Sequence, residues 1–240
     1  DKSGAVWLCD GGLLRYSKGK LERMLDTMGI TKISYDRGTG DFILKTGKGW
    51  QPILYKYHLN DGNSTIDKLN LPRSFYLHVT IDKPGALWIG YEQGIWHYEN
   101  GAAVKGTDAG IGFKQAWVTG MHKDKQGRLW VSADSIYMYD GFSWTSHGSV
   151  LGGMIDNNVL FADDSISVWA INVGNTCYDN KLYRYSGQNW SVADSSVFQF
   201  AGFSFWTAIG SKDGSVWATT NGSVNRFSMG KWKSIQAEAY

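Results

Sequence analysis

A short pattern returns six times along this chain, and it constrains the fold more than any other feature of the sequence. Each copy closes on an aromatic residue, and successive aromatics are separated by 41, 41, 41, 46 and 42 residues. These aromatics are Tyr16, Tyr57, Tyr98, Tyr139, Tyr185 and Phe227. A period of about 40 to 45 residues is typical of the blades of a β-propeller.

Each copy also carries a glycine behind its aromatic residue and, with one exception, an apolar–Trp pair ahead of it. The glycines are Gly19, Gly62, Gly101, Gly141, Gly187 and Gly230. The pairs are Val6-Trp7, Leu87-Trp88, Leu129-Trp130, Val168-Trp169 and Val216-Trp217. The second copy has Phe42-Ile43 in their place. One order of residues, kept at a nearly constant step, predicts one structural unit used six times.

The copy at 109–150 illustrates how each unit divides into four short strands. Strands are expected at about 116–123, 128–133, 135–140 and 142–147, with a turn at 124–127. Alternation is clearest in SIYMYD, where Ile136 and Met138 share one side of the strand and Tyr137 and Tyr139 share the other. Helical signals are weak, and the segment 21–29 is expected to form at most one turn of helix.

The composition supports strands and tight hairpins, with 12 Trp, 13 Tyr, 10 Phe and 30 Gly but only 3 Pro. Burying one aromatic ring removes roughly 150–250 Å² from water, which stabilises a fold by several kcal/mol at about 25 cal/mol per Å². The repeated Trp and the aromatic that closes each copy are therefore interpreted as packing residues between neighbouring blades.

The predicted fold is an all-β β-propeller of six four-stranded blades. The expected blades are 1–28, 29–70, 71–108, 109–150, 151–195 and 196–240. The first copy lacks a first strand of its own, and the segment after Trp232 could supply it and close the ring. A truncated seven-bladed propeller is the alternative.

Charge and cysteine usage exclude several classes of function. The net charge is +2 without a basic tract, so we expect no nucleic-acid partner. No run of about 18 apolar residues occurs, so we expect no membrane insertion. Cys9 and Cys177 are the only cysteines, which excludes a dense disulfide framework. They fall in distant copies, so we expect no bond between them. A chain that starts at Asp1 without a signal peptide is interpreted as a processed form or a piece of a longer protein.

The motif D-x-x-G-x-L-W resembles the two-component regulator propeller repeat. DKPGALWIGYEQGIWHY at 82–98 carries the resemblance most closely, and DKQGRLWVSADSIYMY at 124–139 carries it more loosely. A more distant likeness links these copies to streptogramin lyase propellers and to the Asp-box of sialidases. The resemblance implies a bacterial sensor propeller that lies in the periplasm or outside the cell and often responds to glycans.

On this basis we expect a non-enzymatic, ligand-binding propeller whose ligand is a small polar molecule or a glycan. Aromatic planes cover the C–H faces of a sugar, while amide groups bind its hydroxyls. Four segments, 47–52, 108–117, 171–180 and 198–206, combine these residue types near the expected central opening. The candidate ligand-binding residues are Trp50, Phe113, Trp117, Asn172, Asn175, Tyr178, Phe203 and Trp206.

Two alternatives stay open. A propeller lyase or hydrolase would need an acid and a base near one another, and His78 and His122 are its candidate catalytic residues. A protein–protein scaffold in a cell-surface assembly would need only a rigid face. No short catalytic or metal motif occurs, and a turn explains Asp163-Asp164, so we expect no metal and no cofactor.

Overall fold

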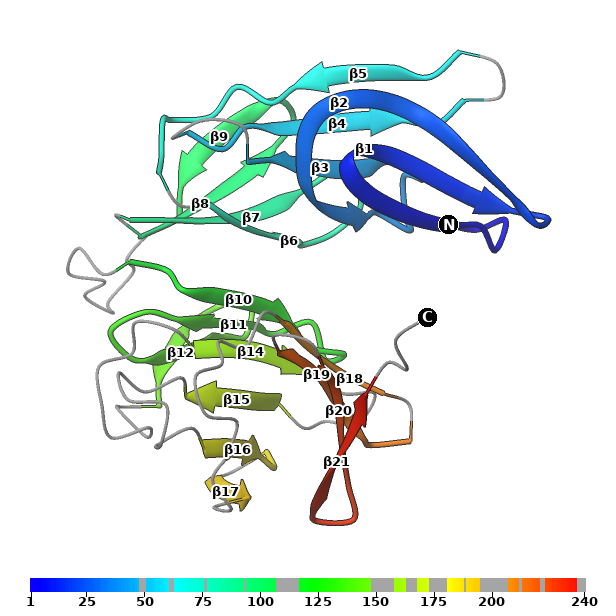
Figure 1. The fold of residues 1–240 in the computed structure, drawn as a ribbon. Helices are drawn as coiled ribbons and strands as arrows, with labels where there is room; N and C mark the ends of the chain where they lie inside the picture. Colours follow the sequence, from blue (N-terminus) through cyan, green and yellow to red (C-terminus); the bar gives the residue numbers. More distant parts are fainter. Residues whose placement is uncertain are drawn as a thin grey trace. The chain divides into compact units, whose positions relative to one another are not determined.

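A computed structural model shows an all-β chain built from small antiparallel sheets (Figure 1). It describes residues 1–47, 51–60, 63–75, 77–92, 94–106, 117–147, 158–162, 168–172, 181–187, 189–194, 207–211, 213–220 and 223–236. In this part of the chain no helix is long and apolar enough to cross a membrane.

The strands form five sheets, and in each sheet the strands lie in chain order. The first sheet comprises β1 (Val6–Ser17), β2 (Lys20–Tyr35), β3 (Phe42–Thr46), β4 (Leu54–His58) and β5 (Thr65–Lys68). The second comprises β6 (His78–Ile81), β7 (Leu87–Tyr91), β8 (Gly94–Glu99) and β9 (Ala102–Lys105). The third comprises β10 (Gly120–Lys123), β11 (Leu129–Ser132), β12 (Ile136–Tyr139) and β13 (Trp144–Ser146). The fourth comprises β14 (Asn158–Ala162), β15 (Val168–Asn172), β16 (Lys181–Tyr185) and β17 (Trp190–Asp194). The fifth comprises β18 (Thr207–Gly210), β19 (Val216–Thr220), β20 (Ser223–Ser228) and β21 (Lys231–Gln236).

The chain divides into two compact units, and each is described by itself. Asp1–Thr107 holds the first two sheets, and Asp108–Tyr240 holds the other three. In the second unit β10 contacts β14, and β14 contacts β18, so the first strands of consecutive sheets lie side by side. Four-stranded meanders that meet along their first strands have the architecture of propeller blades. The predicted fold class is confirmed.

The third sheet matches the strands expected from the sequence. Strands β10 to β13 fall inside the four expected ranges, and the turn between β10 and β11 is closed by the Gly127 amide, which donates to the carbonyl of Asp124. The expectation of a helical turn at 21–29 was wrong. These residues belong to β2, and Leu21, Glu22, Arg23 and Leu25 pair with β1. Pairing with a neighbouring strand overrides a weak local helical preference.

The first two predicted copies share one sheet of five strands. Strand β2 runs without a break from the hairpin of the first copy into the first strand of the second copy, with register shifts on both of its sides. The number of blades and the blade boundaries therefore remain predictions.

The glycines that follow the closing aromatics lie in the hairpin turns between the last two strands of a copy. Three of these turns have positive φ at two successive residues: Lys18-Gly19 (50° and 76°), Asn100-Gly101 (53° and 82°) and Met229-Gly230 (51° and 75°). Two positive φ angles define a type I′ turn, whose twist matches that of the flanking strands.

Three of the repeated indoles pack against the aromatic residue that closes the following copy, as the sequence predicts. Trp130 is fully buried, and its ring centroid lies 4.8 Å from that of Tyr185. Trp169 lies 6.0 Å from Phe227 in the same way. Trp7 lies 6.4 Å from Tyr57, here within the first sheet. These rings join apolar residues of adjacent strands and sheets into continuous cores.

Candidate functional site

Most of the predicted ligand-binding residues fall outside the described residues. Trp50, Phe113, Asn175, Tyr178, Phe203 and Trp206 all belong to this group. Asn172 ends β15, where the backbone alone is described. Trp117 lies before β10, and its side chain is 56% exposed, so its ring is accessible to a ligand. The predicted sugar site therefore stays a prediction.

Structural partners surround the imidazoles of His58, His97 and His147. His58 lies between two carboxylates, with Nδ1 2.8 Å from Asp41 Oδ1 and Nε2 3.2 Å from Asp67 Oδ2. His97 Nε2 lies 3.0 Å from Asp82 Oδ2. The ring of His147 stacks on Trp130. Each of these imidazoles contributes to a sheet or a core rather than to an open site.

In two of the copies, an aspartate in the turn before the Trp strand accepts the same set of hydrogen bonds. Asp124 accepts hydrogen bonds from the amides of Gln126 and Arg128, both at 2.9 Å, and from Trp130 Nε1 at 2.8 Å. Asp1 repeats this pattern in the first copy, accepting from the amides of residues 3 and 5 and from the Trp7 indole at 2.8 Å. The aspartate of the D-x-x-G-x-x-W motif is therefore a structural residue in both copies.

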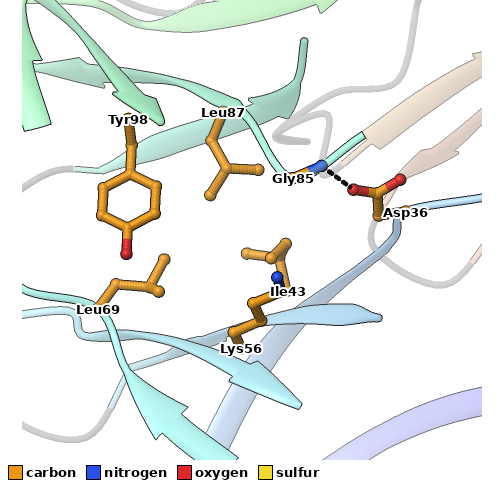
Figure 2. Close-up of a pocket in the computed structure, with 7 residues that line it drawn as sticks. All are labelled: Asp36, Ile43, Lys56, Leu69, Gly85, Leu87 and Tyr98. Atoms are coloured by element: carbon orange, nitrogen blue, oxygen red, sulfur yellow. Dashed lines mark hydrogen bonds between the residues drawn. The ribbon is translucent and has the colours of Figure 1, made fainter. Parts of the chain in front are cut away.

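A pocket lies between the first and second sheets where the second copy lacks a Trp (Figure 2). Its enclosed space is small, and it is partly open to solvent. Its lining residues are Asp36, Ile43, Lys56, Leu69, Gly85, Leu87 and Tyr98. Its polar groups already have partners, because Asp36 accepts a hydrogen bond from the Gly85 amide at 2.8 Å and Lys56 Nζ lies 2.9 Å from Asp41. We interpret it as a packing gap left by Ile43.

Three basic residues of the first unit affect one another's charge, and the sequence analysis did not predict this. Lys32 on β2 lies directly opposite Lys45 on β3 in the antiparallel register. Leu54 lies opposite Lys45 on the other side and belongs to the apolar core between the first two sheets. Because cross-strand partners share a face, both lysines lie on the face of the first sheet that is turned toward the second. We call Lys32, Lys45 and His78 the basic cluster.

His78 brings the second sheet into the basic cluster. It begins β6 between Leu77 and Val79, which are both buried in the core between the sheets. Burial lowers the pKa of His78 to about 4, and the charges of Lys45 and Lys32 lower it further in the same direction. The imidazole is therefore neutral at pH 7. Burial also lowers the pKa of both lysines, although Lys32 still reaches solvent.

No described carboxylate neutralises the lysines of the basic cluster. Other lysines of this unit do have such partners, for example Lys56 with Asp41 at 2.9 Å and Lys83 with Glu99 at 2.9 Å. The nearby carboxylate of Glu92 is instead held by the Ser74 hydroxyl at 2.6 Å and the Phe75 amide. The basic cluster is thus a local excess of positive charge.

The two histidines proposed for catalysis do not occupy equivalent positions in their copies. His78 lies opposite Gly90, two residues beyond Trp88, whereas His122 lies opposite Trp130 itself. His78 has cationic neighbours, and these lower its capacity to accept a proton. Within the described ranges, no group of three or more His, Cys, Asp or Glu residues could hold a metal ion.

No protein-family model matches the chain, and no curated protein matches it. Solved structures resemble it in fold. The extracellular domain of the hybrid two-component system BT3049 from B. thetaiotaomicron superposes with a TM-score of 0.69 at 15% identity, covering 98% of this chain and 33% of that domain. This chain therefore spans about a third of the BT3049 domain.

Two further structures resemble the chain at similar levels. A catalytically inactive virginiamycin B lyase from Staphylococcus aureus, solved with quinupristin, gives a TM-score of 0.66 at 16% identity over 90% of this chain and 74% of the lyase. PorZ, a surface component of the type-IX secretion system of Porphyromonas gingivalis, gives a TM-score of 0.61 at 13% identity. The match covers 90% of this chain and 35% of PorZ. The sequence motif indicated a resemblance to two-component sensor propellers and to streptogramin lyases. Both kinds of protein are among the structures that resemble this chain.

Proposed function

We propose that this chain is a non-enzymatic, ligand-binding β-propeller that works outside the cytoplasm as a sensor or carbohydrate-recognition module. The observation that carries the proposal is the likeness to the extracellular domain of BT3049 over 98% of the chain. The D-x-x-G-x-L-W motif supports it from the sequence. A periplasmic or extracellular location and a glycan ligand belong to this proposal.

The chemistry of the described residues supports binding rather than turnover. His58 and His97 use their carboxylate neighbours to join strands of one sheet. An exposed indole at Trp117 offers a flat apolar face of the kind that covers one side of a sugar ring. Trp50 lies in an insertion that the repeat does not need for its own packing, so its ring is the other aromatic expected to bind.

A thermal-shift screen of mono- and oligosaccharides on the whole chain tests this function. A sugar that raises Tm should bind about two- to tenfold more weakly to Trp50→Ala or Trp117→Ala, because a ring contact contributes about 0.5–1.5 kcal/mol. Phe142→Ala is the matched control, since this aromatic side chain is 95% exposed and lies outside the proposed site. No stabilisation by any sugar, or equal loss in the control, would contradict the proposal.

A propeller lyase is the second candidate, favoured by the likeness to virginiamycin B lyase. It requires His78 or His122 to act as a base, so His122→Ala should abolish turnover while leaving ligand binding in place. The lyase function would be contradicted if the wild-type chain consumes no candidate lactone or glycan and His122→Ala binds the ligand as tightly as the wild type does.

A further inference from the structure

We propose that this chain associates head to tail with further copies of itself, through one apolar face of its first sheet and one apolar face of its fifth sheet. The face of the first sheet is called the Tyr16 face and comprises Val6, Leu8, Tyr16 and Leu21. The face of the fifth sheet is called the Trp217 face and comprises Ile209, Trp217 and Val224. This interaction is independent of the ligand proposed above.

The Tyr16 face lies on the side of the first sheet that is turned away from the core of that sheet. Trp7 packs in this core, and the guanidinium of Arg15 lies 5.9 Å from the Trp7 ring, so both side chains share one side of β1. Successive residues of a strand point to opposite sides. The residues that alternate with Trp7 and Arg15 are Val6, Leu8 and Tyr16, and Leu21 joins them as the cross-strand partner of Tyr16.

The side chains of the Tyr16 face are exposed, although the equivalent side chains of the last copy are buried. The four residues of the Tyr16 face are between 45% and 58% exposed. The residues of the last copy that correspond to its first three members are at most 6% exposed, and they are Val216, Ala218 and Phe227. All three pack in the core that the fifth sheet shares with Trp169 of the fourth sheet. The first sheet therefore presents a face of the kind that packs against the indole of a preceding sheet.

The Trp217 face is the indole-bearing side of the fifth sheet. Ile209 lies directly opposite Trp217, and Val224 lies opposite Thr219, which is two residues beyond Trp217 on the same side of β19. Ile209 is 62% exposed, Val224 is 41% exposed and Trp217 is half-buried. Within the described part of the chain, the Trp217 ring lies 5.4 Å from the guanidinium of Arg226 and has no aromatic partner.

The contact that joins consecutive sheets of this chain indicates what covers the two faces. Trp130 packs against Tyr185 and Trp169 packs against Phe227, so an indole meets the aromatic residue that closes the following copy. A second copy of this chain offers the same combination, because its Trp217 face carries the indole that the Tyr16 face lacks. Head-to-tail association would continue this packing from one chain into the next and would cover two exposed apolar faces.

The two faces differ from each other, which makes the association heterologous. Each copy uses its Tyr16 face toward one neighbour and its Trp217 face toward another. A dimer formed in this way leaves one face of each kind uncovered. Association should therefore continue to larger assemblies as the protein concentration rises.

Sedimentation velocity of the whole chain over a series of concentrations tests the association. The mass of the wild type should rise above that of a monomer. Tyr16→Lys and Trp217→Lys should each weaken the association by about thirtyfold or more, the loss typical of an aromatic residue at the centre of an interface. Phe142→Lys is the matched control, because this aromatic side chain is 95% exposed in a turn of the third sheet and belongs to neither face.

Mixing the two variants separates loss of the contact from loss of the fold. Tyr16→Lys keeps the Trp217 face and Trp217→Lys keeps the Tyr16 face, so each variant alone should be a monomer. An equal mixture should form a dimer and nothing larger. A wild-type chain that is monomeric at every concentration would overturn the proposal. It would also be overturned by an equal loss in Phe142→Lys, or by a mixture that forms no dimer although both variants keep the wild-type Tm.

Discussion

His78 shows how its neighbours alter the chemistry of a single residue. Burial and two lysine charges lower its pKa from 6.5 to about 4, so the folded chain resists a proton that the unfolded chain accepts. Between pH 6.5 and pH 4 the unfolded state binds more protons, and stability must fall as the pH falls through that window. Above pH 6.5 the imidazole of His78 is neutral in both the folded and the unfolded state, so no stability is lost there.

We predict that His78 lowers the free energy of unfolding by up to about 3 kcal/mol between pH 6.5 and pH 4. Urea unfolding at pH 7 and at pH 4.5 measures this loss, and His78→Gln should reduce it because glutamine does not titrate. Lys45→Gln should reduce it partly, since one source of repulsion is gone. An equal loss in wild type and His78→Gln would show that other groups cause it.

Residue types in the sequence indicated which histidines to inspect, but not what surrounds them. His97, for example, is half-buried and its Nε2 lies 3.0 Å from Asp82 Oδ2. Lys32 and Lys45 carry no motif. Their shared face follows from strand register, which a single sequence does not specify across a bulge such as the one between Ile30 and Lys32.

The turn before each Trp strand is the element in which sequence and structure agree most closely. Asp124 is almost completely buried, and its carboxylate accepts hydrogen bonds from two backbone amides, the Trp130 indole and the Arg128 side chain at 2.7 Å. Gly127 adopts a φ of 81°, which a side chain would strain. The motif therefore encodes a closed turn through local contacts alone.

We predict that Asp124→Ala lowers the free energy of unfolding by about 3 kcal/mol, because it leaves buried donors without an acceptor. Asp140→Ala is the matched control, since Asp140 also accepts from two backbone amides in a turn but is exposed to solvent. Chemical denaturation of both variants makes the comparison. A cost at Asp140 equal to that at Asp124 would contradict the role assigned to burial.

At the scale of the whole molecule, the sheets are held together by large side chains at one repeated position. Trp130 and Trp169 fill this position in the second unit and contact Tyr185 and Phe227 of the following sheets. In the first unit Ile43 occupies it and faces Tyr98 across the pocket of Figure 2. The packing between the first two sheets is therefore incomplete.

We predict that Ile43→Ala enlarges this pocket and lowers the free energy of unfolding by about 2–4 kcal/mol. Ile43 is 4% exposed, and its side chain belongs to the core between the first two sheets. Ile235→Ala is the control, because Ile235 is 44% exposed and should cost at most about 0.5 kcal/mol. Chemical denaturation of both variants measures the difference, and an equal cost would contradict the packing role of Ile43.

The sequence by itself determined the strands, the Asp turns, the glycine hairpins and the packing role of the indoles. Each depends on residues within one copy or on a step repeated from copy to copy, so periodicity alone encodes them. Only the tertiary structure decided that β2 joins two copies in one sheet and that Lys32 and Lys45 lie opposite each other. Those outcomes depend on how distant strands pair and which faces they bury, and the local pattern of residues does not specify either.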